Sequence, residues 1–240
     1  MVRRTSKRTR GCPALDGGAG EDHGGVVSVA AQCPRCGGPL WSPDLMHSDW
    51  RCGRHGTVSP LHLPRHVGPE VVDTVRRVSR VPMWCPWPLL PGWLVTGVGW
   101  AGDDRTGAAA TVVACSGPAP LGGPADVILV AEEPGVGLGC GFAGISGVDP
   151  GPALSAEVSG DVAHAKVIAR GHPTPLWSVP SSDDRCVYVG EARGVWLYAV
   201  AFPAAAGYVL AEHVVLHDLT DSRPAELVYG ALSPYLVRTD

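Results

Sequence analysis

Residues 33–56 read CPRCGGPLWSPDLMHSDWRCGRHG, and this stretch decides how the N-terminal part of the chain folds. Two pairs of metal-binding side chains occur in it with the pattern C-x2-C-x15-C-x2-H: Cys33, Cys36, Cys52 and His55. Two knuckles of this kind bring four ligands together around Zn²⁺, and their glycines permit the tight turns. The spacing therefore predicts a zinc-ribbon-like module over residues 31–63, with these four residues as the metal ligands.

A zinc ion held by four protein ligands has no open position for water, so we expect structural rather than catalytic zinc. His47 or His62 could replace His55 as the fourth ligand, although neither belongs to a two-residue knuckle. Unrelated thiols are a further alternative, and a redox Cys-x-x-Cys pair would need a strand-to-helix context. The spacing favours metal over all of these.

The composition describes a globular protein rich in turns. The chain has 240 residues, of which 45% are hydrophobic and 18% charged, with 32 glycines and 23 prolines. Proline breaks interior helices and glycine weakens them, so we expect short strands rather than long helices. The sequence shows no signal-peptide pattern and no apolar run long enough for a membrane span, which predicts a soluble, cytoplasmic protein without a membrane partner.

The chain divides into four predicted segments. Residues 1–30 are basic, then glycine-rich, and are expected to be a disordered arm. After the cysteine module, residues 64–92 hold a predicted helix, 68–80, and a connector rich in proline and tryptophan. Residues 93–240 are predicted to form a β-rich domain.

Eight short runs rich in Val, Leu, Ile or Tyr are bounded by Gly, Pro or Asp, a pattern typical of strands. These predicted strands are residues 93–100, 108–115, 126–132, 164–169, 185–189, 195–202, 208–217 and 226–231. We expect a mainly β fold, with α+β as the alternative, built on a largely antiparallel sheet or barrel.

The charge is unevenly distributed along the chain. Residues 1–80 carry 12 basic and 7 acidic side chains, whereas residues 81–240 carry 7 basic and 16 acidic side chains. A basic front could bind nucleic acid, but the isoelectric point of about 6.1 is not that of a dedicated nucleic-acid binder. Nucleic-acid binding is therefore expected to be weak.

Two further motifs could carry chemistry. The stretch GCGFAG at 139–144 matches G-x-G-x-x-G, but no helical pattern follows it, which favours a glycine-rich loop between strands. The pairs Asp103-Asp104 and Asp183-Asp184 could form an acid/base site, although their flanking residues favour hairpin turns. No catalytic residue and no organic cofactor site is predicted.

The stretch VPMWCPWPLLPGW at 81–93 holds three tryptophans and four prolines, so it predicts an extended aromatic segment. Trp84, Trp87 and Trp93 would either pack into the core or stay exposed and bind a peptide or a stacked ring.

In order and spacing, these motifs resemble those of an uncharacterised family of actinobacterial proteins. The resemblance covers about residues 31–236 and rests on CPRCGG, WRCGRHG, VPMWCPWPLLPGW, AGDD, ACSGPAPLGG, EARGVWLYAV and GALSP. It implies an N-terminal zinc-ribbon-like module and a β-rich body. Some members of that family are loosely labelled phosphotransacetylase, a label that the sequence does not support because no run of helices is predicted.

We therefore expect a zinc-binding protein that acts as a non-catalytic binding or regulatory module with a protein or small-ligand partner. One alternative is a nucleic-acid-binding zinc ribbon, assisted by Arg35, Arg51, Arg54 and the basic N-terminal arm. The other is an acyl or phosphoryl transferase that uses the glycine-rich loop and an Asp pair.

Overall fold

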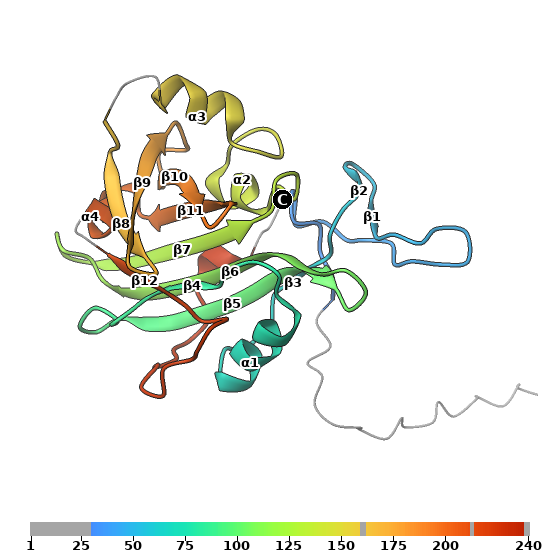
Figure 1. The fold of residues 1–240 in the computed structure, drawn as a ribbon, viewed down its shortest axis with the longest axis horizontal. Coiled ribbons are helices and arrows are strands. Elements are labelled where there is room, and N and C mark those ends of the chain that lie inside the picture. Colours follow the sequence, from blue (N-terminus) through green and yellow to red (C-terminus); the bar gives the residue numbers. More distant parts are fainter. Residues whose placement is uncertain (1–29, 159–161, 212–213, 238–240) are drawn as a thin grey trace, which may run out of the picture.

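The computed structural model of the protein describes residues 30–158, 162–211 and 214–237. Apart from residue 30, the predicted disordered arm lies outside the described residues. Figure 1 shows a large β sheet with helices on both sides and a small lobe at one end. The lobe is the cysteine module, and the sheet with its helices is called the β body below.

The β body is built on one ten-stranded sheet with the order β3-β5-β6-β7-β11-β10-β9-β8-β12-β4. Its strands are β3 (Leu61–His62), β4 (Trp84–Pro86), β5 (Leu94–Asp103), β6 (Gly107–Pro118), β7 (Pro124–Glu132), β8 (Ala165–Ala169), β9 (His172–Val179), β10 (Cys186–Ala192), β11 (Val195–Phe202) and β12 (Val215–Asp218). All neighbours pair antiparallel except β8 and β12, which pair parallel. The predicted mainly β, largely antiparallel fold is confirmed.

The central strands are buried on both faces because their side chains alternate between two apolar clusters. In β6, Val112 and Ala114 join the cluster under α2 (Leu138–Ala143) and α3 (Gly151–Val158). Val113 and Cys115 join the opposite cluster, which also holds residues of α1, β4 and α4 (Tyr208–Ala211). Figure 1 shows α1 on one side of the sheet and α2 and α3 on the other.

The helix predicted over 68–80 is α1 (Pro69–Val78). Proline takes an early position, Glu70 lies in the first turn, and Arg76 and Arg77 lie in the last turn, where they complement the helix dipole. Val71, Val72 and Val75 are buried and pack the helix onto the sheet.

The sheet curls so that its last strand returns to its middle. β4 pairs with β12 and also lies against β6 and β7. Trp84 and Trp93 are buried in the resulting core, whereas Trp87 is only partly buried. The core placement expected for the tryptophans is therefore found for two of the three.

Four stretches differ from their predicted structure. Residues 172–179 form β9, which was not predicted, and 208–217 begin with the short helix α4 before β12. Residues 226–231 contribute only an isolated bridge, between Val95 and Tyr229. The stretch 139–144, expected to be a loop, lies mostly within the short helix α2. Each difference concerns the ends or type of a short element, where local patterns are weakest.

The cysteine module has little regular structure of its own. Its two strands, β1 (Arg51–Cys52) and β2 (Gly56–Thr57), form a hairpin. The chain then enters the sheet of the β body through β3, where backbone hydrogen bonds of 2.8 Å also join Gln32 to Leu61. The module is thus attached to the body by strand pairing as well as by chain connectivity.

Within the described residues, the helices are too short or too polar to cross a membrane.

Candidate metal centre

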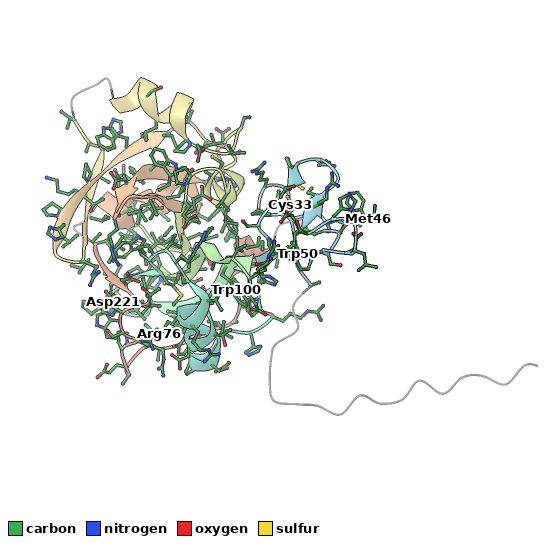
Figure 2. All side chains as sticks on the ribbon, turned by 45° about the vertical axis from the view of Figure 1, so that its right-hand side comes forward. Cys33, Met46, Trp50, Arg76, Trp100 and Asp221 are labelled. Carbon is green, nitrogen blue, oxygen red and sulfur yellow. The ribbon has the colours of Figure 1, made fainter. Side chains whose placement is uncertain are left out.

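The four predicted ligands lie together at the centre of the cysteine module. Their ligand atoms all lie within 4.8 Å of one another, and they come from the two predicted knuckles. Cys33 and Cys52 are buried, while Cys36 and His55 are half-buried. Figure 2 shows Cys33 within the lobe and Met46 at its far end from the body.

Three of the six distances between these atoms match the edges of a tetrahedron around one ion, and all six are at most 4.8 Å. The Cys36 and Cys52 sulfurs are 3.8 Å apart, and His55 Nδ1 lies 3.5 Å from the sulfur of Cys33 and 3.6 Å from that of Cys52. Tetrahedral zinc with Zn–S bonds of about 2.3 Å and Zn–N bonds of about 2.0 Å has edges of roughly 3.8 Å and 3.5 Å. Three soft sulfurs and one imidazole nitrogen are also ligands that zinc prefers. The residues therefore fit a Zn²⁺ ion.

A glycine closes each knuckle. Gly37 has φ 73° and donates its backbone N–H to the carbonyl of Cys33, at 2.8 Å. Gly56 has φ 67° and pairs with Cys52 in the β1–β2 hairpin. Each lies four residues after the first cysteine of its knuckle, and a residue with a side chain would be strained in this left-handed region.

Burial and backbone hydrogen bonds act on the thiol pKa values in opposite directions. Burial raises the pKa of Cys33 to about 12, although hydrogen bonds from the backbone of Arg35 and Cys36 act in the opposite direction. Burial also raises the pKa of Cys52, but bonds from the backbone of Arg54 and His55 outweigh it and lower the pKa to about 6. A bound metal would compensate the charge of the buried thiolates, which must be deprotonated to bind it.

The two alternative histidines lie elsewhere. His62 is in β3, where its Nε2 is 3.1 Å from the carbonyl oxygen of Gly102 and its ring stacks on Trp100. His47 lies beside Asp44 in the exposed loop between the knuckles, with 3.4 Å between Nδ1 and Oδ1. Among the described residues, only the four predicted ligands form a cluster of this kind.

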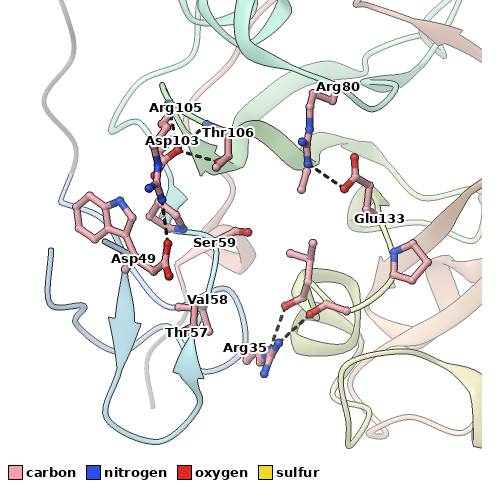
Figure 3. Close-up of a pocket in the computed structure, with 16 residues that line it drawn as sticks. Arg35, Asp49, Thr57, Val58, Ser59, Arg80, Asp103, Arg105, Thr106 and Glu133 are labelled. Atoms are coloured by element: carbon pink, nitrogen blue, oxygen red, sulfur yellow. Dashed lines mark hydrogen bonds and ion pairs between the residues drawn. The ribbon is translucent and has the colours of Figure 1, made fainter. Parts of the chain in front are cut away.

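A polar cleft of about 420 Å³ separates the module from the body (Figure 3). Arg35, from the first knuckle, crosses it and donates to the carbonyls of Gly135 and Val136, at 2.7 and 3.1 Å. Asp49 of the module pairs with Arg105 of the body, at 2.9 Å. The cleft is thus bridged by contacts that hold the module in place.

A buried polar cluster that was not predicted lies just behind the floor of this cleft. Glu132 is fully buried, and its Oε2 accepts hydrogen bonds from the backbone of Leu138 and Gly139, at 2.7 and 3.1 Å. Burial raises the pKa of its carboxyl to about 7. The Tyr198 hydroxyl lies 3.4 Å from the Cys140 sulfur. Glu132 follows Ile128 and Val130 at two-residue spacing, and this was the one sequence signal that it faces inward.

The two Asp pairs do not meet. Asp103 ends β5, close to the end of β7, and its Oδ1 accepts hydrogen bonds from the backbone of Arg105 and Thr106 in a turn. Asp184 lies just before β10. The first residue of β10, Cys186, pairs with Ala201 of β11, and Ala201 in turn pairs with Val127, near the start of β7. The pairs therefore lie at opposite ends of the central strands. The second pair lies near the glycine-rich stretch, because Arg185 donates a 2.7 Å hydrogen bond to the Phe142 carbonyl.

Comparison with known proteins gives one match. The model of a family of unknown function, DUF6758, matches residues 27–236, which include the whole cysteine module and nearly all of the β body. No curated protein and no solved structure matches the chain.

Proposed function

Because the chain belongs to the DUF6758 family of unknown function, its role has to be inferred from its own geometry. We propose that it is a zinc-dependent, non-catalytic binding protein, in which a structural Zn²⁺ ion holds the cysteine module rigid against the β body. Cys33, Cys36, Cys52 and His55 would be the ligands.

One observation carries this proposal: the ligand atoms of the four side chains all lie within 4.8 Å of one another, and three of their six distances, 3.5, 3.6 and 3.8 Å, match the edges of a zinc tetrahedron. Four protein ligands leave the ion no free position at which to activate water. The metal would therefore supply folding free energy rather than chemistry.

The ion would also fix side chains that reach the body. Arg35 lies between Cys33 and Cys36, so the geometry of the first knuckle sets the path of its guanidinium to Gly135 and Val136. A module held in this way gives the protein a defined surface beside the cleft, which suits recognition of a partner.

The transferase alternative requires a site in which a carboxylate pair and the glycine-rich stretch act together. Asp103 of the first pair already accepts two backbone hydrogen bonds in its turn. The second pair lies near the glycine-rich stretch, but both carboxylate oxygens of Asp184 already accept hydrogen bonds from Arg185, at 2.8 and 2.9 Å. Of the three arginines named for nucleic acid, Arg35 would have to leave the carbonyls of Gly135 and Val136 to contact a phosphate, whereas Arg51 and Arg54 are exposed. These observations favour the non-catalytic proposal.

The test is metal analysis of the full chain purified without chelator. We expect about one zinc per chain, lost in Cys33→Ser and Cys52→Ser because three ligands no longer close the shell. Cys186→Ser is the matched control, since this half-buried thiol lies in β10, far from the cluster, and should keep its zinc. Wild-type protein without zinc, or equal zinc loss in the control, would overturn the proposal.

A further inference from the structure

An apolar pocket of about 600 Å³ opens on the β body, outside the metal centre and its cleft. One wall is the connector, residues 86–90, which includes Trp87. The opposite wall is α4 with residues 214–215, and Pro120, from the turn between β6 and β7, adds to the rim. Trp93 and Val127, both buried, lie against the sheet at its floor.

The lining is uniform in chemistry. Among the residues that the structure describes, the twelve that line the pocket are all proline, tryptophan, leucine or valine, and none of these carries a charge. Three are prolines, whose backbone has no N–H to donate: Pro86, Pro88 and Pro120. The indole N–H of Trp93 already donates to the carbonyl of Pro118, at 3.2 Å. These walls offer a ligand van der Waals contact and very few hydrogen bonds.

The edge of the pocket is apolar and accessible. Leu90 is 43% exposed and Val215 is 46% exposed, whereas Leu210 in the wall is only 1% exposed. The pocket therefore extends from an open apolar mouth down to buried core residues. Its volume lies within the range of about 300–1,000 Å³ that is usual for sites of small molecules.

We propose that this pocket binds a small hydrophobic molecule that is uncharged. This inference rests on the proposed function, because it names the class of ligand that a non-catalytic binding protein of this kind would take. A charged group would lose its water in these walls without gaining a partner. An anion would also meet the acidic β body, since residues 81–240 carry 16 acidic and 7 basic side chains.

A small molecule fits these observations better than a protein partner. A protein interface usually surrounds its apolar centre with a polar rim that forms hydrogen bonds. Here the apolar lining continues from the floor to the mouth, and three of its twelve residues cannot donate a backbone hydrogen bond. A compact apolar molecule needs no such bonds.

The experiment titrates the zinc-loaded full chain with Nile red, an uncharged apolar dye, and follows its fluorescence. We expect saturable binding that 1-decanol displaces at lower concentration than decanoate does, because only the latter carries a charge. Leu90→Arg and Val215→Arg should weaken dye binding by about tenfold or more, since each places a cation at the mouth. Leu121→Arg is the control: this residue is 72% exposed and lies next to the pocket without lining it.

Zinc content and melting temperature are measured on every sample. The proposal is overturned if wild-type protein shows no saturable dye binding, if decanoate competes as well as decanol, or if the control weakens binding as much as the two mouth variants. If the mouth variants do not fold, the competition on wild-type protein still decides. Saturable dye binding by a protein that contains no zinc would overturn the metal proposal but support the ligand proposal. A protein that contains zinc but binds no dye would support the metal proposal and overturn the ligand proposal.

Discussion

The cysteine module and the β body are stabilised by different means. The buried cluster of the module contains three residues, Cys33, Cys52 and Val58, and two of them are thiols. The body has clusters of thirty and twenty-one buried residues on the two faces of its sheet. A region with so small a core cannot offset its conformational entropy by apolar burial, whereas the body can. With the proposed zinc ion, the module would depend on metal for its stability, whereas the body would not.

The largest effect we expect is loss of module structure when zinc is removed by a chelator. Structural zinc contributes on the order of 10 kcal/mol to small domains of this kind. Hydrogen exchange should then show loss of protection at Trp41, Arg51 and Val58, whose backbone N–H groups form hydrogen bonds within the module. Amides of β6 and β7 should stay protected. Equal loss of protection in both regions would show that module and body fold as one cooperative unit, which would contradict the difference in their stabilisation.

The body has its own buried charged group, and we expect its removal to have the next largest effect. Asp218 is 1% exposed, pairs with Arg193 at 2.8 Å, and accepts hydrogen bonds from the backbone of Met83 and Thr220. Asp218→Ala should lower the free energy of unfolding by about 3–5 kcal/mol, because these donors and the arginine lose their partner. Chemical denaturation measures this loss.

Asp221→Ala is the matched control for Asp218→Ala. Asp221 also pairs with an arginine, Arg170, at 2.9 Å, but both side chains are largely exposed. Removing such a surface pair should cost no more than about 1 kcal/mol. Zinc content should be unchanged in both variants. Loss of zinc in Asp218→Ala would show that the body's core supports the metal site directly.

Glu132 predicts a pH dependence of the body alone. Its folded pKa of about 7 lies above its ordinary value of 4.5, so the native state holds this proton more strongly than the unfolded state does. Its contribution to stability is therefore full below about pH 4.5 and is lost as pH rises to about 7. The unfolding free energy of wild type minus that of Glu132→Gln should fall by roughly 3 kcal/mol across this window.

Denaturation at several pH values measures that difference, in which contributions shared by both proteins cancel. Glu133→Gln is the control, because Glu133 is an exposed neighbour paired with Arg80 and should show no such slope. A difference between wild type and Glu132→Gln that does not change with pH would mean that Glu132 is ionised at no cost in the folded protein.

The smallest effect should come from the ion pair across the cleft. Arg105 and Asp49 are each at least half exposed, so Arg105→Ala should lower stability by less than about 1 kcal/mol. Thermal melting in low and high salt measures the change. A larger loss, or release of zinc, would show that the module is held to the body by charge rather than by the strand pairing of β3.

The sequence predicted those features that depend on local spacing. The C-x2-C and C-x2-H knuckles are local, so the four candidate ligands could be named in advance, and the module places them within 4.8 Å of one another. The same holds for α1, where capping residues and valine periodicity agree. Strand β9 was missed because Pro173 and Pro175 argue against a strand. The structure accommodates them because both lie in the part of β9 that does not pair with β10.

Features made by distant parts of the chain could not be predicted. The apolar pocket joins residues 86–93 to residues 209–210 and 214–215, which only the order of the sheet brings together. Glu132 needs α2 to fold over it before its carboxylate has partners. In both cases the residue types were visible in the sequence, but the contacts depend on the path of the chain between them.

X-ray absorption at the zinc edge of the purified protein reports the atoms bound to the metal, and so it tests the proposed ligand set. We expect a four-coordinate ion with three sulfurs at about 2.3 Å and one nitrogen at about 2.0 Å. His55→Cys should convert this shell to four sulfurs. A shell with fewer than three sulfurs, or with an added oxygen ligand from water, would contradict the assignment of Cys33, Cys36, Cys52 and His55 as a closed structural zinc site.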